Sequence, residues 1–175
     1  NKTKFNYKKQ KAILFVGKLN YSKGFDLFCN SVVKILDKYT DWKAFVIGDE
    51  PRAKIDIFHP RLHRLGFLSH NEVLKYYNNV SIAVGCSKWD EPLGRVGLES
   101  SSRGCATVVS NKGGLPETIT HGIILNNLTT EDLFDVLDKL IKDNKYRKKI
   151  CYLSYKNFKN NLSKTIKQID AIRDS

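Results

Sequence analysis

The sequence predicts an α/β protein in which a parallel sheet carries helices on both faces. Short apolar runs, typical of strands buried on both faces, recur along the chain. Stretches with helical apolar spacing separate these runs, and right-handed crossovers then place helices on either side of the sheet. A length of 175 residues and a hydrophobic content of 41% suit one domain with a full core. The resulting expectation is a Rossmann-like, three-layer domain.

The first half of the chain is expected to hold three strands and two helices. The strands are expected at residues 11–18, 42–49 and 63–68, and the first two are apolar runs that each reach a glycine. A helical apolar stripe between them consists of Phe28, Val32, Ile35, Leu36 and Tyr39. Ser69 and Glu72 form a capping-box pattern, which predicts a second helix that runs through Tyr77.

The second half continues the alternation, with strands expected at residues 80–87, 105–110 and 122–125. The segment "GRVGLESSSRG" predicts a helix from about Gly94 that Gly104 closes. "LPETI" predicts a short helix or turn. A further helix carries the stripe Leu133, Val136, Leu137, Leu140 and Ile141. Residues 144–175 predict a helical tail whose stripe is looser (Tyr155, Phe158, Leu162, Ile166), so the tail is expected to pack against something outside this chain.

Charge and cysteine content narrow the class of partner. The formal net charge of +12 favours anions such as nucleotides, nucleic acid or acidic lipid. Most lysines are scattered, so many of them simply decorate a solvated surface, and the dense run "KYRKK" reads best as an exposed helix face. The four cysteines have no metal-ligand spacing, which indicates free thiols in a reducing compartment and no metal. No apolar stretch reaches the length of a membrane span, and the N-terminus lacks a signal-peptide pattern.

The loops after the strands are where a parallel sheet of this class binds ligands. After the first strand, "GKLNYSKGFD" places Lys18 and Lys23 on either side of a turn. Gly17 lets the backbone approach a ligand closely, and Ser22 is expected to cap the next helix. The segment matches neither the P-loop nor the GxGxxG pattern. Two lysines beside a helix N-terminus suit a diphosphate; the alternative is that both are surface lysines.

The segment "DEPLGRVGLE" brings two acids close to a helix N-terminus. A helix that starts near Gly94 directs free amides toward the loop, and such amides favour an anion. The Glu99 side chain leans back toward the same end and could accept hydrogen bonds from a vicinal diol such as ribose. Glu91 lies before the helix and could accept from a second polyhydroxyl group. The alternative is an acid that merely stabilises the helix dipole.

Three motifs in the same order resemble the nucleotide-sugar domain of retaining glycosyltransferases of the group 1 family. They are "VGKLNYSKG", "EPLGRVGLE" with seven residues between Glu91 and Glu99, and "GGLPE", and the similarity covers residues 13–143. The resemblance implies one half of a GT-B fold, with residues 1–175 as the donor domain and 144–175 as its tail. The chain contains no Met, so we expect a piece of a longer protein whose N-terminal acceptor domain is absent here.

The resemblance also assigns roles to individual residues. Lys23 corresponds to the lysine that contacts the diphosphate, and Lys18 stands where the family more often has arginine. Glu91 corresponds to the acid near the transferred sugar and Glu99 to the acid that holds ribose. Gly94, Arg95 and Val96 correspond to the residues whose loop and helix amides contact the donor. Leu93 stands where phenylalanine is usual. Gly66, Phe67 and Leu68 fall where the base is held. Gly113 and Gly114 are expected to shape a turn rather than contact the donor.

The implied reaction moves a sugar, with retention, from a UDP- or GDP-sugar to a saccharide or lipid-linked acceptor. Lys18, Lys23 and the helix amides would stabilise the departing diphosphate, so neither a cofactor nor a metal is expected. Such an enzyme would act in polysaccharide biosynthesis in the cytoplasm, and the full-length protein could contact the inner membrane face. No nucleic-acid partner is expected. The isolated domain is expected to be inactive. Two alternatives stay open: a GT-B-like epimerase or phosphorylase, and a basic nucleic-acid-binding module, which would interleave aromatics with clustered cations.

Overall fold

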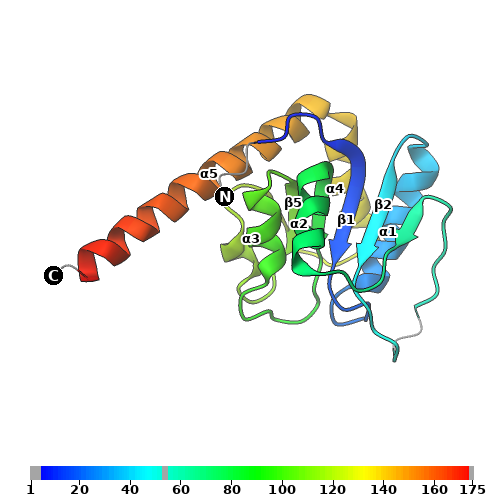
Figure 1. The fold of residues 1–175 in the computed structure, drawn as a ribbon. Helices are drawn as coiled ribbons and strands as arrows, with labels where there is room; N and C mark the ends of the chain where they lie inside the picture. Colours follow the sequence, from blue (N-terminus) through cyan, green and yellow to red (C-terminus); the bar gives the residue numbers. More distant parts are fainter. Residues whose placement is uncertain (1–4, 53–54, 174–175) are drawn as a thin grey trace.

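A computed structural model shows a six-stranded, fully parallel sheet with the strand order β3-β2-β1-β4-β5-β6 (Figure 1). The structure describes residues 5–52 and 55–173, and for 159–173 the backbone only. The strands are β1 (Gln10–Val16), β2 (Lys43–Ile47), β3 (Leu62–Arg64), β4 (Val80–Gly85), β5 (Ala106–Ser110) and β6 (Ile123–Leu125). The helices are α1 (Phe25–Lys38), α2 (His70–Asn79), α3 (Arg95–Ser102), the short 3-10 helix η1 (Leu115–Thr118), α4 (Thr130–Lys142) and α5 (Asn144–Arg173).

Helices cover both faces of the sheet, so the predicted Rossmann-like α/β class is confirmed. Successive β1 side chains point to opposite faces. Ile13 and Phe15 join the larger core, which α1 and α4 cover, whereas Ala12 and Leu14 join a smaller core under α2. The helical stripes predicted for α1 and α4 supply the larger core, because Phe28, Val32, Leu36, Leu133 and Leu137 are buried there.

Two local expectations are wrong. The third strand ends at Arg64 rather than at Leu68, because Gly66 takes a left-handed conformation at φ 68° and turns the chain. Ser22 does not cap α1: its hydroxyl donates to Asn20, and Gly24 occupies the N-cap position without a side-chain hydrogen bond. The capping box at Ser69 and the helix closure at Gly104 form as predicted.

The strand order creates a switch point between β1 and β4. From β1 the chain runs outward through β2 and β3, then returns to place β4 on the other side of β1. Connections therefore leave the carboxyl ends of β1 and β4 in opposite directions, which opens a crevice between them. This crevice is where the sequence predicts ligand binding.

The segment expected to be the tail contains α5, which crosses one end of the domain (Figure 1). Of its predicted stripe, Tyr155 is buried with its ring 5.3 Å from that of Phe5, whereas the side chains of Leu162 and Ile166 lie outside the described residues. Among the described helices, none is both long and apolar enough to span a membrane.

Candidate functional site

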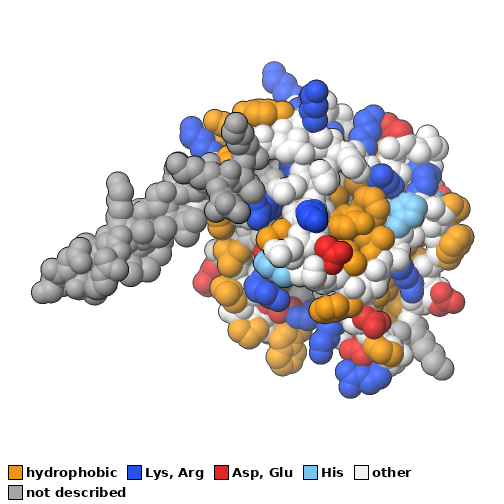
Figure 2. Space-filling model, viewed as in Figure 1, with side chains coloured by type: hydrophobic (Ala, Val, Ile, Leu, Met, Phe, Trp, Pro, Cys, Tyr) orange, Lys and Arg blue, Asp and Glu red, His pale blue; other side chains and the backbone are white. Residues whose placement is uncertain are grey.

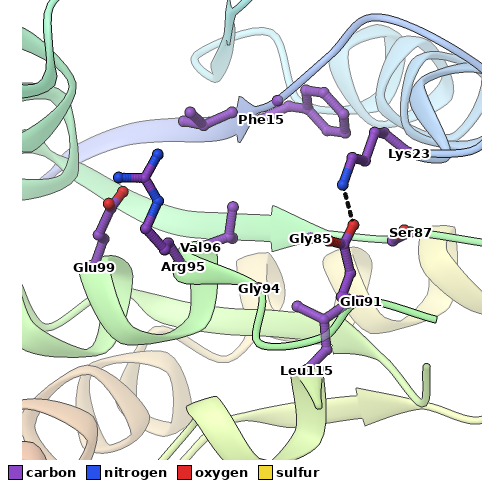
Figure 3. A pocket seen from close by; sticks show the side chains of 12 residues that line it. Phe15, Lys23, Gly85, Ser87, Glu91, Gly94, Arg95, Val96, Glu99 and Leu115 are labelled. Atoms are coloured by element: carbon purple, nitrogen blue, oxygen red, sulfur yellow. Dashed lines mark hydrogen bonds and ion pairs between the residues drawn. The ribbon is translucent and has the colours of Figure 1, made fainter. Parts of the chain in front are cut away.

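A cavity of about 330 Å³ opens at the carboxyl ends of β1 and β4 (Figure 3). Its walls come from the ends of these two strands, the loop before α1, and the loop and first turns of α3. The lining residues are Phe15, Val16, Gly17, Lys23, Gly85, Ser87, Glu91, Gly94, Arg95, Val96, Glu99 and Leu115. Seven of the predicted site residues therefore converge on one cavity: Gly17, Lys23, Glu91, Gly94, Arg95, Val96 and Glu99.

Lys23 is held at the cavity by the loop that precedes α1. The Asn20 side chain accepts a hydrogen bond from the Lys23 amide at 3.0 Å. Gly24 follows at φ 70°, and a Cβ there would lie 1.9 Å from the carbonyl oxygen of Cys86. Only glycine allows this approach to the chain just beyond β4. The loop thus fixes the lysine against the crevice.

Glu91 faces Lys23 across the cavity and forms an ion pair with it (Figure 3). The Glu91 side chain is 14% exposed and that of Lys23 is 31% exposed. The two glycines of "GGLPE" support the loop that carries Glu91. The amide of Gly114 donates to the Glu91 carbonyl at 2.7 Å, and a Cβ on Gly113 would lie 2.3 Å from the same oxygen. The expected structural role of these glycines matches this geometry.

The N-terminus of α3 opens into the cavity between the two acids. Gly94 occupies the N-cap position at φ 68°, no side chain caps the helix, and its first turn carries no acid. A Cβ on Gly94 would lie 2.4 Å from Leu115, so glycine is required for packing as well as for conformation. The uncapped amides and the helix dipole leave a positive potential that suits an anion.

Glu99 lies further along α3, beside Arg95 (Figure 3). Burial raises the pKa of the Glu99 carboxyl, and the positive charges of His70 and Arg95 oppose that rise. His70 Nδ1 lies 3.6 Å from Glu99 Oε1. Sequence spacing does not point to this histidine, because the nearest acid in the chain, Glu72, belongs to the capping box and only the packing of α2 against α3 brings Glu99 close.

Several predicted site residues lie outside the lining among the described residues. They are Lys18, Gly66, Phe67, Leu68 and Leu93. Lys18 is exposed, and its charge acts on Glu50, whose pKa is lowered mainly by a hydrogen bond from Arg52. Phe67 is 85% exposed on the loop between β3 and α2. The structure therefore separates one inner group, around Lys23, Glu91 and Glu99, from an outer group at the rim of the domain.

The described part of the chain shows neither a group of metal ligands nor a reactive thiol. There, no three His, Cys, Asp or Glu side chains lie close enough to hold a metal ion. The four cysteines are buried free thiols. Burial raises the pKa of Cys29, Cys86 and Cys151 to about 12, so these thiols are poor nucleophiles.

The family model described as glycosyl transferases group 1 matches residues 1–157. This chain belongs to that family. Among the curated relatives of this group 1 domain is spore coat protein SA of Bacillus subtilis, 29% identical over 126 residues, which cover 65% of the chain and 33% of the relative. An uncharacterized glycosyltransferase of Methanocaldococcus jannaschii is 32% identical over 65% of the chain and 30% of its own length. The group 1 domain thus spans about a third of the length of these relatives.

Solved structures show the same fold. The C-terminal domain of a glycosyl transferase group 1 family protein (LpcC) from Francisella tularensis matches with a TM-score of 0.74 and 27% identity. That match covers 87% of the group 1 domain and 86% of the solved chain. Anabaena Alr3699/HepE, solved with UDP and glucose, matches with a TM-score of 0.75 and 17% identity over 95% of this domain and 49% of that chain. The structural neighbours are GT-B glycosyltransferases.

Proposed function

We propose that the cavity between β1 and β4 holds a nucleoside-diphosphate sugar, and that the domain is the donor half of a retaining glycosyltransferase. One observation carries the proposal: Glu91 and Glu99 lie on either side of the uncapped N-terminus of α3 within a single cavity (Figure 3). A sugar nucleotide has the matching pattern, with two polyhydroxyl groups joined by a diphosphate. Membership of the group 1 family supports this assignment.

The diphosphate is assigned to the N-terminus of α3, with Lys23 and Arg95 beside it. Cleavage of the bond between the sugar and the diphosphate leaves negative charge on the diphosphate. Helix amides and cations that are already in place stabilise this charge, which is electrostatic catalysis. Lys18 is proposed to contribute less to this stabilisation, because it does not line the cavity.

The two carboxylates position the ends of the donor. Glu99 is assigned to the ribose and Glu91 to hydroxyls of the transferred sugar. The outer group at the rim, with Gly66 to Leu68 and Leu93, is assigned to the base and to the outer wall of the sugar site. Uracil is the first base to test, because the Anabaena structure of the same fold contains UDP and glucose. Guanine, in a GDP-sugar, is the second.

The acceptor is proposed to be a saccharide or a lipid-linked saccharide held by another domain of the full-length protein. This places the enzyme in polysaccharide biosynthesis in the cytoplasm, with contact at the inner membrane face. A donor domain alone lacks the acceptor site, so the isolated chain is expected to bind the donor and to transfer nothing. A normal transfer rate from the isolated chain would contradict the assignment of the acceptor site to another domain.

Calorimetry with the 175-residue chain tests the donor assignment. UDP-glucose, GDP-mannose and ADP-glucose are titrated separately, and binding of one of them is expected. Glu99→Gln is expected to weaken that binding by about tenfold, since two hydroxyls lose a charged acceptor. Absence of binding by all three nucleotide sugars would contradict the proposed function. Retention is tested in the full-length protein by NMR of the anomeric proton in the first product formed.

A further inference from the structure

We infer that His70 is a positioning residue that keeps the Glu99 carboxylate ionised and directed at the ribose of the donor. This inference rests on the proposed function and extends it to a residue on a different helix. Its basis is the 3.6 Å separation between His70 Nδ1 and Glu99 Oε1, which joins α2 to α3 at the edge of the cavity. His70 does not line the cavity among the described residues, so it acts through Glu99.

The position of His70 is fixed by the capping box at the start of α2. Ser69 and Glu72 close this box: the Ser69 amide donates to Glu72 Oε2 at 2.9 Å and the Ser69 hydroxyl donates to the same oxygen at 2.6 Å. His70 is the first residue of the helix, so its backbone is held by these bonds. The imidazole is 56% exposed while its carboxylate partner is only 15% exposed. Protons can therefore exchange at the histidine while the acid stays sheltered.

Three titratable or charged groups of the described residues surround Glu99. Arg95 comes from α3 itself, and His70 and Tyr77 come from α2, which packs against α3. Tyr77 is fully buried, and its hydroxyl has no hydrogen-bond partner within the described part of the molecule. Burial and the Glu99 charge raise its pKa, so it stays neutral. Arginine stays charged at any physiological pH. Histidine is the one type among these three whose charge normally changes between about pH 5 and 8.

The protonated imidazole stabilises the Glu99 carboxylate against the cost of burial. An ionised carboxylate is an acceptor only, with room for both hydroxyls of a vicinal diol, whereas a protonated carboxyl must donate one of its own bonds. Donor affinity should then fall on both sides of an optimum. On the acid side Glu99 takes up a proton. On the alkaline side His70 loses its charge and its hold on the carboxylate.

Calorimetric titration with UDP-glucose between pH 5 and 8.5 tests this inference. UDP-glucose is the probe because its diphosphate has no proton to lose in this range, unlike a terminal phosphate. In the unmodified chain, affinity is expected to fall about two- to fivefold as His70 deprotonates, the size of a partly exposed ion pair. His70→Ala should remove this alkaline limb and lower the affinity at its optimum by the same factor. His70→Lys should keep the high affinity and abolish the alkaline limb.

Asn71→Ala, also exposed in the first turn of α2, is the matched control and should behave like the unmodified chain. A pH profile that is the same with and without His70 would overturn the inference and leave the donor assignment intact. No binding of UDP-glucose to the unmodified chain, where GDP- and ADP-sugars also fail, would overturn both.

Discussion

Lys23 and Glu91 form an ion pair across the cavity, although 68 residues separate them in the sequence. Each neutralises the charge of the other. A diphosphate that enters between them offers Lys23 a second anionic partner, and the freed Glu91 oxygen can accept from a sugar hydroxyl. Under the proposed function, the pair keeps two charged groups in place for the donor without leaving either one isolated.

Replacement of Lys23 should weaken the binding of UDP far more than replacement of Lys18. The Lys23 side chain lines the cavity and can form a charge-assisted hydrogen bond to the diphosphate, whereas Lys18 is exposed outside it. Loss of such a bond is worth about 1.5–3 kcal/mol, or about tenfold to a hundredfold in affinity. Calorimetry should show this loss for Lys23→Gln and less than about threefold for Lys18→Gln. Equal losses would mean that both lysines reach the diphosphate in the complex.

The two acids should differ in which part of the donor they recognise. Glu99→Gln is expected to weaken the binding of UDP and of UDP-glucose by the same factor, because both ligands contain ribose. Glu91→Gln should not weaken the binding of UDP, because it removes a carboxylate that competes with the diphosphate for Lys23. It should reduce the preference for UDP-glucose over UDP, because Glu91 is assigned to the sugar. The ratio of the two dissociation constants measures the effect directly. If the Glu91 variant loses affinity for UDP and for UDP-glucose by the same factor, the assignment of this acid to the sugar is wrong.

The arrangement at the start of α3 could be predicted from the sequence because it is local. Gly94, Arg95 and Glu99 share one short helix, so spacing along the chain determines how they face the cavity. The apolar runs that form β1 and β4 are similarly local, which is why the parallel sheet and its ligand edge could be predicted. The start of a helix near Gly94 could be predicted from this glycine and the helical pattern that follows it.

Contacts between distant segments could not be predicted in the same way. The His70–Glu99 and Lys23–Glu91 pairs depend on how loops and helices pack, and no periodic pattern records that packing. The end of β3 and the cap of α1 were mispredicted for a related reason. Gly66 and Gly24 both take left-handed conformations, and these override the strand pattern in one case and the side-chain cap in the other.

Gly24→Ala and Gly66→Ala should separate steric conflict from backbone strain. Both glycines have nearly the same φ, 70° and 68°, so alanine suffers similar conformational strain of about 1–2 kcal/mol at either position. At Gly66 a Cβ meets nothing within 4 Å, whereas at Gly24 it would lie 1.9 Å from the Cys86 carbonyl oxygen. Urea unfolding should show a loss for Gly24→Ala that exceeds the Gly66→Ala loss by about 1–3 kcal/mol. Similar losses would show that the loop of Lys23 shifts without cost.

Asp138 on α4 should make the stability of the domain depend on pH. Burial alone would raise the pKa of this carboxyl, but hydrogen bonds from Lys142, Lys38 and Tyr39, each of 2.7 Å, hold it well below its ordinary value of 3.8. A carboxyl with a lowered pKa in the folded state contributes stability above its unfolded pKa and loses it as the pH falls through the folded one. Asp138→Asn should therefore lower the free energy of unfolding by about 1 kcal/mol at pH 7, since the exposed lysines weaken each ion pair.

The difference between the unmodified chain and Asp138→Asn should shrink as the pH falls below 3.8, because the unmodified carboxyl then loses the advantage that the variant never had. Asp135→Asn is the matched control, since Asp135 is exposed on the same helix, and its effect should be small at every pH. Urea unfolding of the three proteins between pH 3 and 7 measures both effects. If the loss in Asp138→Asn stays constant across that range, the interactions of Asp138 stabilise α1 against α4 through hydrogen-bond geometry rather than through charge.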